Sequence, residues 1–190
     1  MKILGLLFST IISIVSVAGE YTIDPAHSHV GFKVRYMMLG SVYGQFNQFQ
    51  GQVILTDGIL SEINGQIDVA SIDTNNIKRD AHLRSDDFFN ANNYPNITFK
   101  TTQVAKNEVG YTAIGELEIH GIKNKVSIPF TLTDKIVDVY GNERMGLSGQ
   151  LKINRKEYGI MYSKKMDNGG LVVDDYVDIE LNVQVVKKSS

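Results

Sequence analysis

Two histidines that could bind a metal stand two positions apart, His27 and His29. On a strand, side chains at this spacing leave the same face, which is the geometry of some two-histidine metal sites. The other histidines, His82 and His120, are distant in the sequence, and no third ligand stands nearby at a suitable spacing. We therefore favour a polar strand entry in which His27 bonds a neighbouring carboxylate or carbonyl, and we expect no bound metal.

A dense charged cluster follows in the middle of the chain. Its members are Arg79, Asp80, His82, Arg84, Asp86 and Asp87. One interpretation is a site for an anionic head group such as a pyrophosphate, which bidentate Arg donors bind well. The other is a self-neutralising network in which either arginine pairs with Asp73, Asp80 or Asp86. The mixed signs favour the network, because an anion site would normally carry surplus positive charge. Arg155 invites the same two interpretations.

The common enzyme templates are missing. Ser28 lies between two histidines without the pattern of a catalytic triad, and the chain has no Gly-x-Ser-x-Gly motif, phosphate loop or dinucleotide fingerprint. Cysteine is absent, which excludes a thiol nucleophile, disulfides and Cys-ligated metals. We expect a protein that is not an enzyme and that uses no cofactor.

The composition is that of one globular domain. Of the 190 residues 43% are hydrophobic and 21% are charged, which disfavours both disorder and a multi-span membrane protein. The formal net charge of -2 provides no cationic field, so nucleic acid is not an expected partner.

The N-terminal stretch is typical of a secretory signal peptide. Lys2 precedes an apolar run over residues 3–17, and small residues end the run at Ala18. A run of about 15 residues is shorter than the roughly 20 that span a bilayer. We therefore predict a signal peptide at residues 1–18 and one domain at residues 19–190. An exported chain without cysteine favours the bacterial periplasm, or secretion, as the location.

The mature chain alternates apolar and polar residues with period two. The last strand is the clearest, because Val177, Ile179, Leu181, Val183 and Val185 all point one way. About eight such segments follow one another through short turns, which leaves no room for helical crossovers and predicts antiparallel order. The pattern predicts an all-β fold, either a barrel or two stacked sheets. We also expect a bulge between Phe46 and Phe49, and an edge or bulge at Pro129.

Residues 73–95 interrupt this alternation, and we name them the lid segment. Asp73 and Thr74 can cap a helix over residues 75–83, with Ile77 and Ala81 on one face. A second short turn is expected to follow Ser85 and to carry Phe88 and Phe89.

An eight-stranded barrel can be filled by its own side chains or can hold one small ligand. The inward positions are mainly Val, Ile and Leu, and composition leaves both alternatives open. The residues that we predict to form the wall of a cavity are Phe32, Val34, Tyr36, Phe46, Ile67, Val69, Phe99, Leu117, Ile119 and Ile153, with Phe88 and Phe89 at the lid.

Several motifs give the chain a family resemblance. They are YTIDPAHSHVGF at residues 21–32, DTN at 73–75, RDAHLRSDDFF at 79–89, YP at 94–95, GELEIHG at 115–121 and NRKEYG at 154–159. In this order they resemble the YceI-like family of bacterial periplasmic proteins over essentially the whole mature chain. One departure is visible: many members have His where this chain has Tyr36, so a head-group contact at that position is not expected to be retained.

The resemblance implies a lipocalin-like extended antiparallel barrel that holds a long isoprenoid or other lipid chain in its interior. It is also compatible with transient membrane contact and with a homodimer. The polar residues that would serve the head group or the lid are His27, Arg79, Asp80, His82, Arg84 and Arg155. Two alternatives stay open: a structural or stress-associated barrel without a ligand, and, less favoured, a His-based metalloprotein.

Overall fold

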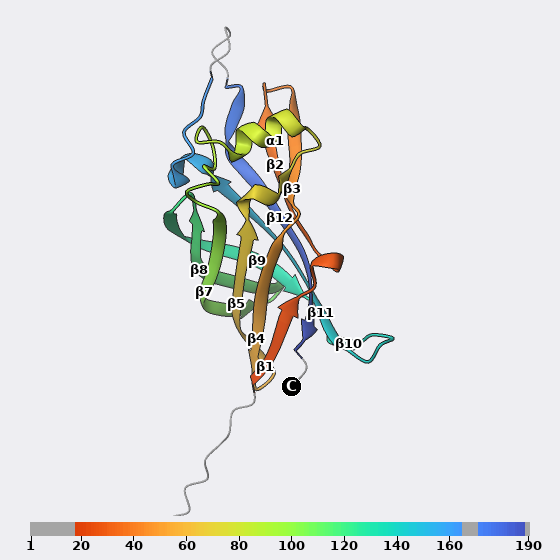
Figure 1. Ribbon diagram of the computed structural model, residues 1–190. Coiled ribbons are helices and arrows are strands. Elements are labelled where there is room, and N and C mark those ends of the chain that lie inside the picture. The colour runs from red at the N-terminus through yellow and green to blue at the C-terminus, as the bar shows by residue number, and fades with distance from the viewer. Residues whose placement is uncertain (1–17, 165–170, 189–190) are drawn as a thin grey trace, which may run out of the picture.

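A computed structural model describes residues 18–164 and 171–188 (Figure 1). The predicted signal peptide therefore lies, except for Ala18, outside the described residues. The strands are β1 (Ala18–Ile23), β2 (His29–Tyr36), β3 (Gly40–Phe46), β4 (Phe49–Thr56), β5 (Ile59–Asp68), β6 (Ile72–Asp73), β7 (Asn96–Asn107), β8 (Gly110–Ile119), β9 (Ile122–Leu132), β10 (Ile136–Val137), β11 (Glu143–Asn154) and β12 (Val173–Lys187). One α-helix, α1 (Ile77–Arg84), and the 3₁₀ turns Pro25–His27, Val69–Ser71 and Arg155–Tyr158 complete the described elements.

The predicted antiparallel barrel is confirmed. Its closed circuit runs β11–β9–β8–β7–β5–β4–β1–β12 and returns to β11, so eight strands form the wall. The closing pair is long, because β11 and β12 stay in register from Arg144 opposite Val186 to Asn154 opposite Tyr176. Closure gives each strand of the wall an inner and an outer face.

Strand β12 is long enough to pair with both β1 and β2 along one edge. β1 ends opposite Val185, and β2 begins opposite Asn182. Between them Asp24 caps the 3₁₀ turn Pro25–His27, whose Pro is suited to a first helical position. Strands β3 and β6 continue the sheet beyond β2, which makes the barrel taller on that side.

The prediction of a bulge between Phe46 and Phe49 is wrong, because the chain forms two separate strands there. β3 ends at Phe46 and pairs with β2, whereas β4 begins at Phe49 and pairs with β1 and β5. The intervening Asn47 donates its backbone N–H to the carbonyl of Ser71 at 3.1 Å. The strand divides at this point because its partners β1 and β2 have already separated.

The prediction for Pro129 is confirmed. β9 pairs with β11 only over residues 130–132, so its earlier residues form an edge on that side. The 3₁₀ turn Arg155–Tyr158 lies beside this edge, since the Asn124 side chain donates to the carbonyl of Glu157 at 3.0 Å. Tyr158 is buried there.

One end of the barrel is closely packed, and we name it the base. Tyr21, Val53 and Val185 are almost fully buried in it, and the Tyr21 hydroxyl donates to the Glu143 carboxylate. The C-terminal end of β12 also lies at this end of the molecule (Figure 1). Higher in the barrel the inward side chains of β12, such as Ile179, are only partly buried. This difference indicates a filled base and a hollow middle.

The lid segment lies at the opposite end, where α1 sits beside the tips of β2 and β3 (Figure 1). The helix begins later than predicted. Its N-cap is Asn76, whose side chain accepts from the Arg79 backbone N–H at 3.0 Å, rather than Asp73 or Thr74. Asp73 instead accepts from the backbone N–H of Asn75 at 2.8 Å, which forms a local turn before the helix.

The expected apolar face of α1 is also wrong. Ile77 is 85% exposed, and Ala81 is exposed as well. The buried side chain is Asp80, which is 7% exposed and accepts from both the backbone N–H and the hydroxyl of Thr74, at 2.9 and 2.5 Å. The charge-assisted hydrogen bonds of Asp80, together with the partly buried Leu83, therefore orient this helix.

Candidate functional site

The hollow middle of the barrel contains two apolar cavities. The larger, which we name the lower chamber, has a volume of about 180 Å³ and is bordered by residues of β1, β2, β3, β4, β5, β7, β8, β9, β11 and β12. Its lining includes Ile67, Phe99 and Leu117 from three neighbouring strands. An apolar void of this size is suited to hydrocarbon, because water would find few hydrogen-bond partners there.

Two glycines face each other across β4 and β5 at the wall of the lower chamber. Gly51 pairs with Gly65 on the inner side of the ladder, so no side chain covers the backbone at this row. A Cβ atom at Gly65 would make one ordinary contact, 3.9 Å from the Gln50 carbonyl oxygen, whereas one at Gly51 would collide with the Asn64 carbonyl and with Ile23. The bay beside Gly65 is therefore part of the cavity.

The second cavity, the upper chamber, has a volume of about 110 Å³ and lies under the lid segment. Leu83, Phe88 and Phe89 of the lid segment form one side of it, and Val34 of β2 and Ile153 of β11 are on the others. The upper chamber thus separates the lower chamber from the lid.

Most of the predicted wall residues border these chambers. Those that do are Phe32, Val34, Phe46, Ile67, Phe88, Phe89, Phe99, Leu117, Ile119 and Ile153. Two do not. Tyr36 ends β2 beyond the chambers and is 40% exposed, and Val69 is buried in a 3₁₀ turn that packs beneath the lid segment.

Sequence reasoning missed further wall positions, both on strands that already carried a predicted residue and on β1, β4, β9 and β12. They include Ile23, Val30, Phe49, Ile63, Gly65, Ile97, Ile128, Leu147, Leu151, Ile179, Leu181 and Val183. The signal was available for β12, where the alternation already puts Ile179, Leu181 and Val183 on one face. It was not available for Gly65, because a glycine in a strand does not by itself indicate an empty space.

The charged residues of α1 are engaged within the protein. Arg79 donates to the hydroxyl and to the carbonyl of Thr74, both at 2.7 Å, and Arg84 donates to the carbonyls of Ala70 and Ile72 at 3.4 Å. Within the described part of the chain, no ion pair joins either arginine to a carboxylate, so the expected Arg–Asp pairs are wrong in detail. The donors fasten the lid segment through backbone groups instead.

His82 of α1 contacts both the turn that follows the helix and the segment after β11. Its Nε2 atom lies 2.8 Å from the Asp87 carboxylate, and its ring meets Phe88 and Tyr162 edge-on, with centroid distances of 5.0 Å to each. His82 therefore packs behind Phe88 rather than lining a chamber.

Arg155 borders the upper chamber, but its N–H groups donate mainly to backbone carbonyls rather than into the chamber. The residue is 4% exposed and donates to the carbonyls of Ile160 at 2.7 Å, Asp174 at 2.9 Å and Val173 at 3.4 Å, and to the Asp175 carboxylate at 3.2 Å. Burial lowers the pKa of Arg155 below its ordinary value, and Asp175 opposes this effect. Arg155 thus joins the start of β12 to the segment after β11.

The two histidines at the start of β2 lie in different surroundings. His27 Nδ1 lies 2.9 Å from the Asp24 carboxylate, as expected for a polar strand entry, and Arg144 donates to the same carboxylate at 2.6 Å. His29 lies on the outer face of β2. Across residues 18–164 and 171–188, no group of three or more His, Asp or Glu side chains is gathered as a metal site would require.

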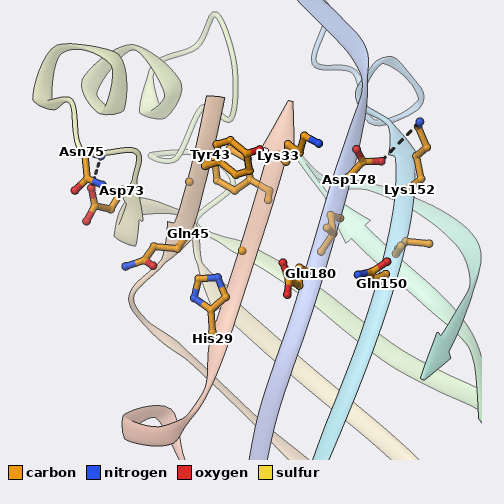
Figure 2. Close-up of a pocket in the computed structure, with 15 residues that line it drawn as sticks. His29, Lys33, Tyr43, Gln45, Asp73, Asn75, Gln150, Lys152, Asp178 and Glu180 are labelled. Atoms are coloured by element: carbon orange, nitrogen blue, oxygen red, sulfur yellow. Dashed lines mark hydrogen bonds and ion pairs between the residues drawn. The ribbon is translucent and has the colours of Figure 1, made fainter. Parts of the chain in front are cut away.

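A wide groove of about 520 Å³ lies on the outside of the barrel (Figure 2). Its polar side chains come mainly from β2, β3, β11 and β12 and include His29, Lys33, Tyr43, Gln45, Gln150, Lys152, Asp178 and Glu180. Several charges are matched locally: Lys152 lies 3.7 Å from Asp178, and the Lys33 ammonium lies 5.8 Å from the centre of the Tyr43 ring. Because the groove is polar and open, it cannot bury a hydrocarbon chain, and the inner chambers are the stronger candidate site.

The fold and the chambers together define a small antiparallel barrel with an apolar interior under a lid. Comparison with known proteins agrees with this class: the family model of the YceI-like domain matches residues 21–185. A UPF0312 protein of Yersinia enterocolitica is 34% identical over 149 residues, which cover 76% of this chain and 78% of the relative. The chain belongs to the YceI-like family.

Solved structures share the architecture. Burkholderia cenocepacia BcnA is 25% identical with a TM-score of 0.74, over 85% of this chain and 98% of that one. A polyisoprenoid binding domain from Saccharophagus degradans has a TM-score of 0.64 over 88% of this chain and 98% of its own, at 16% identity. The second likeness concerns the fold alone. No helix among the described residues is long and apolar enough to cross a membrane.

Proposed function

We propose that this protein binds the chain of a long isoprenoid or fatty amphiphile inside its barrel, and sequesters or carries it in the periplasm without transforming it. The observation that carries the proposal is the pair of apolar chambers between a packed base and a lid. The name of the Saccharophagus degradans domain, which binds polyisoprenoid, supports the ligand class. The predicted signal peptide supports the location.

The energetics suit a carrier. Each buried methylene group contributes roughly 0.8 kcal/mol, so about ten would contribute about 8 kcal/mol before the cost of ordering the chain. Dispersion and hydrophobic contacts have little directionality, which favours tolerance among chains of similar width. Chain length and width, rather than a polar code, would then determine which ligands fit.

For the polar residues we propose a structural role at the lid rather than head-group binding. The donors of Arg79, Arg84 and Arg155 already bond backbone carbonyls, Thr74 or Asp175. His27 belongs to a cluster with Asp24 and Arg144, at the end of β11 away from the upper chamber.

The lid end also offers a surface for transient membrane contact. The hairpin between β2 and β3 exposes Met38 and Leu39 at its tip, and Leu39 is 91% exposed. Apolar side chains at a protruding tip can enter the interfacial region of a bilayer. Exchange of a lipid through this end would bring the upper chamber close to the membrane. The homodimer stays a prediction from the resemblance.

A displacement assay with matched variants tests the proposal. We expect Leu117→Gln in the lower chamber and Val34→Gln in the upper chamber to abolish uptake of a fluorescent fatty-acid probe, because each places an amide in an apolar space. Glu116→Gln, on the outer face of β8 beside Leu117, removes only an exposed ion pair to Lys123 and is the control.

Val34 is only partly buried, whereas Leu117 is buried, so we expect the Val34 variant to retain the fold even if the change at Leu117 does not. Circular dichroism checks the fold of each variant before binding is measured. Uptake at the wild-type level by folded Val34→Gln and Leu117→Gln would contradict binding inside the barrel.

A further inference from the structure

The two chambers meet at a ring of five side chains. Phe32, Phe46, Ile97, Ile119 and Ile179 border both chambers, and they come from β2, β3, β7, β8 and β12. A residue that borders both cavities stands between them. These five side chains lie where the two chambers adjoin, and we name them the partition.

Aromatic contacts hold the partition together. The ring centroids of Phe32 and Phe46 are 5.7 Å apart, and Phe46 meets Phe89 edge-on at 6.2 Å. Both separations lie in the range of favourable aromatic pairs. Because Phe89 belongs to the lid segment, the position of Phe46 depends on the position of the lid.

Phe32 is positioned by a glycine on the neighbouring strand. Gly44 pairs with Phe32 in the ladder between β2 and β3, and a Cβ atom there would collide with the Phe32 ring and with the Thr74 methyl group. The ring therefore lies against bare backbone. This close approach keeps the Phe32 side chain beside Phe46.

A ligand chain would meet this partition on its way in. The base is filled by Tyr21, Val53, Leu55 and Val185, so a chain enters from the lid end and reaches the upper chamber first. Each chamber alone is smaller than the roughly 300 Å³ at which ligand pockets usually begin, and the two together approach that value.

We propose that Phe46, together with Phe32, is a gate that divides the cavity and determines the length of the bound chain. This inference rests on the proposed lipid-binding function. With the gate closed, a short chain occupies the upper chamber. A longer chain enters the lower chamber only when the Phe46 ring turns aside, and movement of the lid segment releases that ring through Phe89.

Two substitutions change the cavity in opposite directions. Phe46→Ala removes the gate and joins the chambers. Gly65→Leu is designed to fill the bay of the lower chamber, since a Cβ atom there makes only an ordinary contact with the Gln50 carbonyl oxygen. Glu62→Gln, at an exposed position of β5, is the control because that residue borders neither chamber. Phe46→Leu removes less volume and replaces Phe46→Ala if the latter does not fold.

The probes are saturated fatty acids of about 8 to about 20 carbons, titrated against a fluorescent fatty acid and followed by native mass spectrometry. We expect Phe46→Ala to bind the longest acids about tenfold more tightly than the wild type, the effect of about two further buried methylene groups. Gly65→Leu is expected to move the preference toward shorter acids, and Glu62→Gln to retain the wild-type profile.

The possible results distinguish failure of the gate proposal from failure of the lipid-binding proposal. Fatty-acid binding by the wild type, with the same length profile in Phe46→Ala, Phe46→Leu and the wild type, would overturn the gate and leave the lipid-binding function intact. Absence of binding by the wild type and by every variant would overturn both.

Discussion

At the scale of single residues, the arginines that the sequence offers as anion-binding candidates instead form hydrogen bonds within the protein, mainly to backbone carbonyls. Arg155 is the clearest case, because its guanidinium donates to three backbone carbonyls and to the Asp175 carboxylate while almost completely buried. The planar, multiply donating guanidinium suits this role better than the single ammonium of Lys. Sequence alone could not decide between an anion site and this role, since both require the same residue type.

A second charged group makes stability depend on pH. Arg144 lies between Asp24 and Asp138 and donates to each at 2.6 Å. Its hydrogen bond is the largest cause that lowers the pKa of each carboxyl below the ordinary value of 3.8. The unfolded chain therefore binds protons at a higher pH than the folded chain, and the stabilisation present at neutral pH is lost as the pH falls below that value.

We predict that Arg144→Gln makes this acid dependence shallower. Without the guanidinium both carboxyl pKa values return toward 3.8, so less stability remains to be lost. Urea denaturation at about pH 6 and at about pH 3 measures the difference. Lys152→Gln, which removes an exposed pair with Asp178, is the control. An equal loss of stability between the two pH values in wild type and Arg144→Gln would refute the assignment.

At the scale of elements, the lid depends on a polar fastening. α1 has eight residues, fewer than an isolated helix needs in water, and its exposed Ile77 contributes no packing. Asp80 holds it through Thr74, which in turn accepts from Arg79. Removing this acceptor should loosen the lid while leaving the barrel intact, because the strand ladders lie outside the network.

We predict that Asp80→Ala increases hydrogen exchange in residues 77–84 at least about tenfold, since a lost charge-assisted hydrogen bond corresponds to roughly 1.5 kcal/mol or more. Exchange in β11 and β12 is expected to stay at the wild-type level. Asp86→Asn changes an exposed carboxylate of the same segment and serves as the matched control. Protection of α1 that is equal in Asp80→Ala and wild type would show that other contacts hold the lid.

The sequence could predict the strands better than the lid. Period-two alternation identifies β12 and its inner face, because each inward position carries Val, Ile or Leu. The same logic failed for α1, where Ile77 and Ala81 are exposed and Asp80 is buried. Helical periodicity counts apolar residues, and it cannot detect that Thr74 supplies the partner for a buried carboxylate.

The chambers were less predictable still. Alternation shows that Leu117 faces inward, but whether it meets another side chain or empty space depends on the distance across the barrel. Gly51 and Gly65 are far from adjacent in the sequence, and only the ladder between β4 and β5 places them opposite each other. The partition around Phe46 is made by residues from several strands and contacts Phe89 of the lid segment. The alternation within one strand carries no information about such contacts between segments.

At the scale of the whole molecule, the barrel has a filled base, a hollow middle and a lid. The core residues form one group around Tyr21 and Val185 in the base and another around Val30 and Tyr158 beneath the lid, with the chambers between and beside them. Larger side chains that filled the whole interior would bury more apolar surface and stabilise the barrel further. We interpret the retained space as the feature on which lipid binding depends.

The most direct measurement is native mass spectrometry of the protein purified from its own cells without detergent, followed by extraction into organic solvent. We predict an added mass at a ratio of one ligand per chain, and an extract that contains an amphiphile with a long isoprenoid or fatty chain. A bare protein mass, an empty extract and no uptake when such chains are supplied would contradict the account and favour a barrel that works without a ligand.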